Sequence, residues 1–395
     1  MKLFHILPLV LLSISLIFVS CSDEPSSVGI ELIGSDYIVV KTFDSAVDTI
    51  NQNSSYFKNV IPLGTSDWIL VGKKQNTTAY TLMKFIFSLP DSLKTDVLAD
   101  NLNITSAWIQ LRNKYTYTSA DTLGTMNFTV HEVNSYWTYT SFTIDSLPNL
   151  QYNASDVSSN FIINDTSYTF NINNSLPLAW MKNSADNTVE SNFGIYLEPT
   201  SSSNKIVGFQ ALTAFSSQAA KLYVVVEKVG AYVDTISGII AADISLVDSP
   251  LPTLPSGLMC VQSSVAVDSR LTFDIGVLPP DLVINKAEII ITADTINSIK
   301  GSSYNNSIKV FYLKSEDSLD ILGSAITLLY SEGNYTGDIT GFVRSWVSSK
   351  QNYGMLVQAG NQILGVDLFA LKGSDYQEIS ERPRLRITYT RQMNK

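Results

Sequence analysis

Asn192-Phe193-Gly194-Ile195-Tyr196-Leu197 is the stretch that decides the fold, because nearly the same pattern returns later as Asn352-Tyr353-Gly354-Met355-Leu356-Val357. A tryptophan precedes each copy, in Trp180-Met181 and in Trp346-Val347. Repetition of this kind marks a structural unit that the chain contains twice. We expect a structural role for the repeated residues, which are Trp180, Asn192, Gly194, Trp346, Asn352 and Gly354.

The repeat extends in both directions from this stretch. Three further pairs of segments recur in the same order: 82–90 with 271–279, 104–111 with 284–291, and 221–226 with 384–389. The spacing between them varies, since Ala107 follows Phe85 by 22 positions whereas Ala287 follows Phe273 by 14. Loops that run over a surface tolerate such changes in length, so the repeated segments are expected to be strands.

Strand signals dominate the rest of the chain. Short runs rich in β-branched and aromatic residues, bounded by turn residues, occur at 37–43, 127–133, 168–172 and 309–313. Helical signals are confined to 175–183 and 340–349, just ahead of each Asn-aromatic-Gly motif. Such a short helix would lay one tryptophan onto the end of a sandwich as part of the core. The pattern predicts an all-β fold of two tandem antiparallel β-sandwich or jelly-roll domains.

The length of the chain fits two domains better than one core. We place the first domain at 37–229 and the second at 230–395. Residues 1–20 are expected to form a signal peptide. Residues 21–36, which contain Pro25, Gly29 and Gly34, are expected to form a short tether.

The N-terminus carries an apolar run that ends at a cysteine. Lys2 precedes a mostly apolar stretch to residue 19, and Ser20 and then Cys21 follow. The run is too short and too abruptly ended to favour a spanning helix. It resembles a bacterial lipoprotein signal, which implies a lipid on Cys21, membrane attachment through that lipid, and a surface-exposed place in the outer membrane. The second cysteine, Cys260, is expected to be a small core residue.

Composition narrows the range of partners. The chain has 26 basic and 36 acidic residues and a net charge of −10. This sign argues against nucleic acid as a partner, because nucleic acid binding needs a basic face. Only 16% of the residues are charged, so uncharged polar groups supply the solubility, as is typical of extracellular β proteins.

The order of the motifs resembles the DNRLRE family. The motifs are a strand ending in Leu-Pro, an Ile-x-x-Ala segment, the tryptophan, the Asn-aromatic-Gly motif and, at 382–389, Arg-Pro-Arg-Leu-Arg-Ile-Thr-Tyr. The resemblance implies secreted jelly-roll modules, some of which bind polysaccharide. The first copy departs from it, since Ala219-Ala220-Lys221 replaces the closing Arg-Pro-Arg. These motifs are structural, so the resemblance indicates the fold more firmly than the ligand.

The sequence offers few groups for catalysis. Beyond the predicted signal peptide, His131 is the one histidine, and no Gly-x-Ser-x-Gly elbow accompanies it. There is no His pair or Cys cluster at metal-binding spacing, no phosphate loop and no dinucleotide fingerprint. We therefore expect no enzyme activity, no metal and no cofactor.

Aromatic residues outside the repeat are the candidates for a glycan site. Trp137 and Tyr139 lie in a polar-flanked cluster and form the leading candidate platform. The others are Trp68, and Tyr115 with Tyr117, which are two apart and hence on one face of a strand. Flat aromatic faces suit the C–H-rich surfaces of sugars. The alternative is that these aromatics belong to the core or close loops over it.

The sequence thus predicts a non-catalytic cell-surface lipoprotein that binds polysaccharide or another surface polymer. The alternative is a structural or assembly lipoprotein that contacts a partner protein in the outer envelope and has no glycan site. We expect the function to lie where the two copies differ, above all in the long insert between Ala107 and Trp180.

Overall fold

The structure is a computed structural model that describes residues 40–48, 50–118, 124–212, 217–279, 282–316 and 320–391. The predicted signal peptide, Cys21 and the predicted tether lie outside these residues. Among the helices within these ranges, none combines the length and the apolar character that a membrane crossing requires.

The described chain is mainly β, with 50% strand and 11% helix, in two antiparallel sheets of which one closes into a barrel. The expectation of an all-β, sandwich-like fold is therefore confirmed. Unit one is built on a ten-stranded sheet of β3 (Trp68–Lys74), β4 (Thr77–Phe87), β5 (Asn103–Thr116), β6 (Phe128–Glu132), β7 (Ser158–Ile163), β8 (Ser167–Ile172), β9 (Ile195–Pro199), β10 (Ile206–Gln210), β11 (Lys221–Lys228) and β12 (Tyr232–Asp248).

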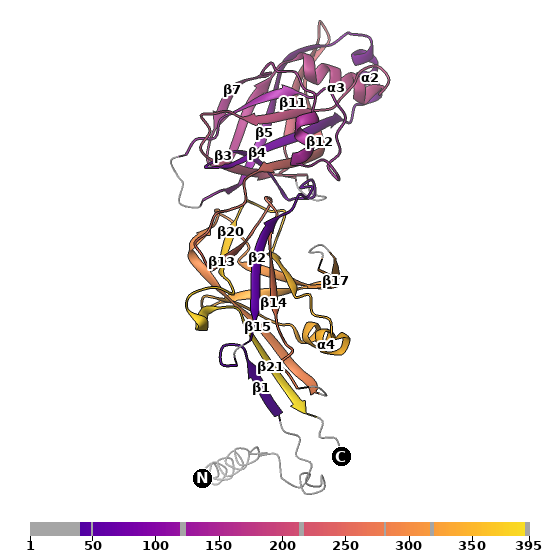
Figure 1. The fold of residues 1–395 in the computed structure, drawn as a ribbon. Coiled ribbons are helices and arrows are strands. Elements are labelled where there is room, and N and C mark those ends of the chain that lie inside the picture. The colour runs from indigo at the N-terminus through magenta and orange to yellow at the C-terminus, as the bar shows by residue number, and fades with distance from the viewer. Residues whose placement is uncertain are drawn as a thin grey trace, which may run out of the picture.

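Unit two is built on an eleven-stranded sheet of β1 (Val40–Asp44), β2 (Gln52–Lys58), β13 (Leu258–Gln262), β14 (Val267–Phe273), β15 (Leu282–Ile299), β16 (Ser307–Leu313), β17 (Ile321–Ser331), β18 (Asn334–Asp338), β19 (Met355–Ala359), β20 (Leu368–Lys372) and β21 (Arg384–Arg391). The two units lie end to end (Figure 1). The helices are α2 (Asp91–Leu98), α3 (Ser175–Ala185) and α4 (Thr340–Ser349), with short 3-10 helices η2 (Ile144–Asn149) and η3 (Ile379–Glu381). The positions of α3 and α4 confirm the two helical segments expected ahead of the repeated motif, whereas α2 shows that confining helices to these segments was wrong.

The repeated segments occupy equivalent places in the two units. β4 pairs with β9 in unit one, and β14 pairs with β19 in unit two. Likewise β5 pairs with β11, and β15 pairs with β21. The sequence repeat is therefore also a repeat of strand pairing.

The Asn-aromatic-Gly motif locks one strand onto its neighbour. The side-chain amide of Asn192 donates to the carbonyl of Phe85 at 2.7 Å, and its oxygen accepts the N–H of Gly194 at 3.1 Å. Asn352 makes the same two bonds in unit two, at 2.6 Å to the carbonyl of Phe273 and 3.0 Å from the next glycine N–H. Both glycines have φ near +80°, a backbone conformation that favours glycine.

The two repeated tryptophans lie in the cores. Trp180 stacks on Phe85 with ring centroids 6.3 Å apart, and Trp346 stacks on Tyr312 at the same separation. Both indoles are almost fully buried. Each tryptophan thus ties its helix to the sheet beneath, as a core residue does.

The strands next to each unit in the sequence pair with the other unit. β12 directly precedes the strands of unit two, yet it pairs with β11 and β4 of unit one. Conversely, β1 and β2 precede unit one, yet they pair with β21 and β14 of unit two. In the repeat, β4 corresponds to β14 and β11 corresponds to β21. The pair β1 and β2 therefore takes the place in unit two that β12 takes in unit one.

This exchange means that the predicted ranges 37–229 and 230–395 do not coincide with the two sheets. The sequence repeat shows the order of the segments, but the partner of a flanking strand is decided by long-range pairing. β1 and β21 consequently lie side by side at the end of unit two that is remote from unit one (Figure 1).

Tyr115 of β5 anchors unit one to unit two. Its hydroxyl donates to Asp367 Oδ1 at 3.1 Å and accepts the N–H of Val366 at 3.0 Å. The ring lies so close to Gly301 and Gly365 that a Cβ on either glycine would meet it. A buried apolar cluster with residues from both units surrounds this anchor, so the units form a packed junction.

Candidate functional site

Three of the aromatics proposed for a glycan platform are buried. Trp137 is 8% exposed, and its indole N–H donates to the carbonyl of Phe193 at 2.7 Å. Tyr115 and Tyr117 are 2% and 3% exposed, in the cluster at the junction of the units. A buried ring offers no face to a sugar, so these residues take the alternative role, that of core residues.

The remaining two candidates do not form a common platform. Trp68 stacks on Tyr115 with ring centroids 5.0 Å apart, which places it at the junction. Tyr139 is 42% exposed, and its backbone packs closely against Gly64. The structure therefore brings Trp68 and Tyr115 together and leaves Tyr139 alone as an exposed ring from the predicted set.

His131 has a structural environment. It is buried on β6, where its Nε2 lies 2.8 Å from Thr129 Oγ1 and its Nδ1 lies 3.1 Å from the carbonyl oxygen of Asn153. Both ring nitrogens are thus engaged by neighbours.

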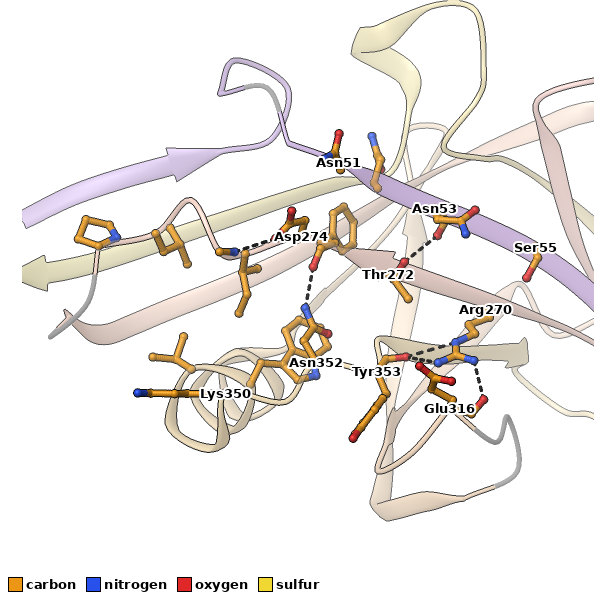
Figure 2. Close-up of a pocket in the computed structure, with 18 residues that line it drawn as sticks. Asn51, Asn53, Ser55, Arg270, Thr272, Asp274, Glu316, Lys350, Asn352 and Tyr353 are labelled. Carbon is orange, nitrogen blue, oxygen red and sulfur yellow. Dashed lines mark hydrogen bonds between the residues drawn. The ribbon is translucent and has the colours of Figure 1, made fainter.

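A cleft of about 1120 Å³ opens on unit two, between β2, β14, the turn after β14, and the end of α4 (Figure 2). Its lining mixes uncharged polar, charged and apolar groups. Sites that hold small molecules or polymer segments commonly combine an apolar wall with a few placed polar groups. This cleft is therefore the candidate functional site.

Two adjacent strands supply the polar part of the lining. In the register of β2 and β14, Asn53 is opposite Thr272 and Ser55 is opposite Arg270. The N–H of Asp274 donates to the carbonyl of Asn51 at 2.7 Å, which extends the pairing by one step. Alternate residues of a strand share a face, so the six side chains form one surface. We call this surface the polar ladder: Asn51, Asn53, Ser55, Arg270, Thr272 and Asp274.

The polar ladder has free hydrogen-bonding capacity on its β2 side. The side chains of Asn51, Asn53 and Ser55 have no hydrogen-bond partner among the described residues. Figure 2 shows them along one strand, with Arg270 and Thr272 on the next. Amide and hydroxyl groups both donate and accept, so this row can bind a ligand that does the same.

Arg270 is held in place by backbone carbonyls. Its Nη2 and Nε donate to the carbonyl of Tyr353 at 2.9 and 3.3 Å, and its Nη1 donates to the carbonyl of Glu316 at 2.7 Å (Figure 2). The bonds to Tyr353 lie within the repeated motif, directly before Gly354. The motif therefore positions a cleft residue in unit two as well as locking a strand.

The apolar part of the lining comes from α4 and the turn after β14. Trp346, Val347 and Leu278 contribute to it. The indole N–H of Trp346 is buried and has no hydrogen-bond partner among the described residues. A buried donor of this kind costs roughly 1–3 kcal/mol when it stays unpaired.

The difference in length between the two copies explains why the cleft lies in unit two. In unit one, the longer connection from β4 to β5 forms α2, which packs against α3 and buries Leu93 and Val97 in the same cluster as Trp180. In unit two, the connection from β14 to β15 contains no helix among its described residues, and 274–279 borders the cleft. The helix that packs near Trp180 thus has no counterpart near Trp346.

The described residues show no arrangement for metal binding. Within the ranges that the structure describes, no group of three or more His, Cys, Asp or Glu side chains could hold a metal ion. Burial raises the pKa of Asp243 to about 7 and the pKa values of Asp268 and Asp367 to about 6, but none of these three carboxyls lines the cleft.

Sequence reasoning identified Trp346 and Asn352 as structural residues but missed the polar ladder. One signal was present: the shorter spacing from Phe273 to Ala287 marks the place where unit two lacks a helix. The pairing of β2 with β14 was not visible in the sequence, and half of the polar ladder depends on it.

Comparisons with known proteins leave the family of this chain open. No family model and no curated protein matches it. A solved structure, that of the Macrobrachium rosenbergii nodavirus, aligns over 90% of both chains at 11% identity with a TM-score of 0.09. A similarity this low carries no argument about fold or function.

Proposed function

We propose that this chain is a non-catalytic lipoprotein of the bacterial outer membrane that binds polysaccharide or another surface polymer. The observation that supports the proposal is the cleft of unit two, which is lined by a row of uncharged polar side chains and by partly buried apolar residues. Hydroxyl groups of a sugar pair with amides and hydroxyls, while its C–H faces pack against apolar and aromatic surface.

The N-terminal residues support the proposed attachment. The cysteine at position 21 resembles a lipoprotein acylation site, and 18 residues, 22–39, separate it from β1. A chain of that length spans at most about 60 Å. Because β1 begins at the end of unit two remote from unit one, a lipid on Cys21 would place unit two nearer the membrane and unit one farther out (Figure 1).

Affinity electrophoresis of residues 22–395 in gels containing soluble polysaccharides tests the proposal. We expect at least one polysaccharide to slow the protein, and Thr272→Trp to abolish this effect, because an indole in the middle of the polar ladder would fill the cleft. Thr235→Trp is the matched control, since Thr235 is exposed on β12, away from the cleft. Normal migration in every polysaccharide would contradict the proposal.

A second candidate function has its own observation. β7 lies at the end of the sheet path of unit one and exposes the apolar side chains of Phe161, Ile162 and Ile163. An exposed apolar edge strand is a template for strand addition by a partner protein. This edge supports the alternative of a structural or assembly lipoprotein that contacts an envelope protein.

A photo-crosslinking residue at position 162, in the native envelope, tests the second candidate. It should give one discrete adduct, whereas the same residue at the exposed Ser92 of α2 should give none. Equal labelling at both positions would speak against a contact at β7.

A further inference from the structure

We infer that the cleft of unit two accepts an extended, uncharged, polyhydroxylated chain that lies along the polar ladder. The inference rests on the proposed function and deepens it by assigning the chemical class of the ligand and the residues that recognise it.

The shape of the site favours an extended ligand. The polar ladder runs from residue 51 to residue 55 of the chain, which at the rise of a strand corresponds to about 13 Å. The cleft volume of about 1120 Å³ exceeds the range of pockets for drug-sized molecules, which is roughly 300–1,000 Å³. Three successive pairs of side chains along one direction match a chain with a repeated pattern of polar groups.

The charges of the lining favour an uncharged ligand. Arg270 and Lys350 are matched by Asp274 and Glu316, so the four charged side chains of the lining sum to zero. Arg270 already uses its guanidinium on two backbone carbonyls, which limits its capacity for the bidentate pairing that a carboxylate or phosphate would use. An acidic polymer would also meet two carboxylates in the same cleft.

The free groups of β2 favour hydroxyls. Asn51, Asn53 and Ser55 lack partners among the described residues and are exposed. Each of them both donates and accepts, and a hydroxyl does the same. Beside them, the partly exposed apolar side chains of Val347, Ile275 and Leu278 suit the C–H faces of a sugar ring.

Calorimetry on residues 22–395 tests this assignment with three kinds of probe: dextran and mixed-linkage β-glucan as neutral chains, polygalacturonate as an acidic chain, and chitosan oligomers as a basic chain. We expect a neutral chain to bind best. Its affinity should change less than twofold between 50 and 500 mM salt, because screening acts on charged pairs and not on neutral ones.

Removal of the free groups should weaken that binding. The triple variant Asn51→Ala, Asn53→Ala and Ser55→Ala should lose at least tenfold in affinity, since each hydrogen bond contributes a few-fold. The matched control is Thr235→Ala with Ser237→Ala, two exposed polar residues of β12, the strand of unit one that corresponds to β1 with β2. The control should change affinity less than twofold, and the far-ultraviolet circular dichroism of both variants should match that of the parent.

The outcomes separate this inference from the proposed function. Tighter binding of polygalacturonate or chitosan than of either neutral chain would overturn the inference, and so would unchanged affinity in the triple variant. Either result leaves polymer binding itself intact. Absence of binding to every polymer, in this assay and in the gels, would overturn the proposed function and the inference with it.

Discussion

The repeated glycine of the Asn-aromatic-Gly motif allows a sharp test, because the chain contains a matched glycine elsewhere. Gly354 has φ +81°, and a Cβ there would lie closer than 3.0 Å to the carbonyl oxygen of Leu271, a distance that real Cβ atoms essentially never show. Gly333, in the turn between β17 and β18, has φ +83° and nothing within 4 Å of the position of a Cβ. The two glycines therefore share a backbone conformation and differ in crowding.

Gly333→Ala should cost only the strain of an alanine in the left-handed region, about 1–2 kcal/mol of unfolding free energy. Gly354→Ala carries the same strain, and it also forces β19 away from β14 at the pair Leu271–Met355. Separating Leu271 from Met355 breaks backbone hydrogen bonds, and each broken bond costs about 0.5–1.5 kcal/mol of unfolding free energy. The separation also loosens the packing of the fully buried Met355. We expect a total loss of about 4 kcal/mol or more.

Equilibrium unfolding in urea, applied to residues 22–395, measures both losses. The comparison repeats in unit one, where Gly194 has φ +82° with its Cβ position against the carbonyl of Met83, while Gly230 has φ +74° in open space. Losses within about 0.5 kcal/mol of each other for Gly354→Ala and Gly333→Ala would refute the argument, since close approach would then contribute nothing.

Three further predictions concern buried carboxyls, the exchanged strands and the junction. Burial raises the pKa of Asp243 to about 7 and those of Asp268 and Asp367 to about 6, so the folded state holds these protons more tightly than the unfolded chain does. The resulting stability is fully present below about pH 4 and is lost as the pH rises through 6 and 7, so the urea midpoint should be higher at pH 5 than at pH 8. Deletion of 40–58 should abolish slow hydrogen exchange in β14 while β4 keeps it, because only unit two loses strands. Tyr115→Phe should cost about 1–3 kcal/mol, because Asp367 loses a hydroxyl donor in a buried site.

Each of these predictions has a contradicting result. Equal urea midpoints at pH 5 and pH 8, at one ionic strength, would show that the pKa values of the buried carboxyls are not raised in the folded state. Protection of β14 after the deletion would show that unit two folds without β1 and β2. Tyr117→Phe is the control at the junction, because the buried Tyr117 hydroxyl has no hydrogen-bond partner among the described residues. An equal loss for both tyrosines would exclude a role for the hydroxyl of Tyr115.

The repeat made much of the fold predictable. The asparagine and glycine of the motif share a local cause, the hydrogen bond from the glycine N–H to the asparagine side chain and the positive φ of the glycine, and local causes leave a pattern in the sequence. The two helices ahead of the motif were predictable for the same reason, since Phe342, Val343 and Trp346 have helical spacing and are all buried.

Burial and strand partners were harder to predict, because both depend on residues far away in the chain. Trp137 has polar neighbours in sequence, yet its environment is decided by the carbonyl of Phe193, 56 positions away. The polar character of Asn51, Asn53 and Ser55 was visible, but their place in the cleft comes from pairing with β14, far along the chain. Local composition therefore pointed to the wrong aromatics and did not reveal the polar ladder.

The exchange of strands sets an order for the maturation of the protein. All the strands of unit one lie between residues 68 and 248, so its sheet can close before β13 to β21 of unit two are synthesised. The sheet of unit two needs both β1 and β21, which pair with each other although they lie far apart in the sequence, so it closes only once both strands are present. The cleft shares this dependence, since β2 forms one of its walls. A chain that lacks β1 and β2 would thus form unit one without the cleft, and the ligand binding that we propose would report that these two strands are in place.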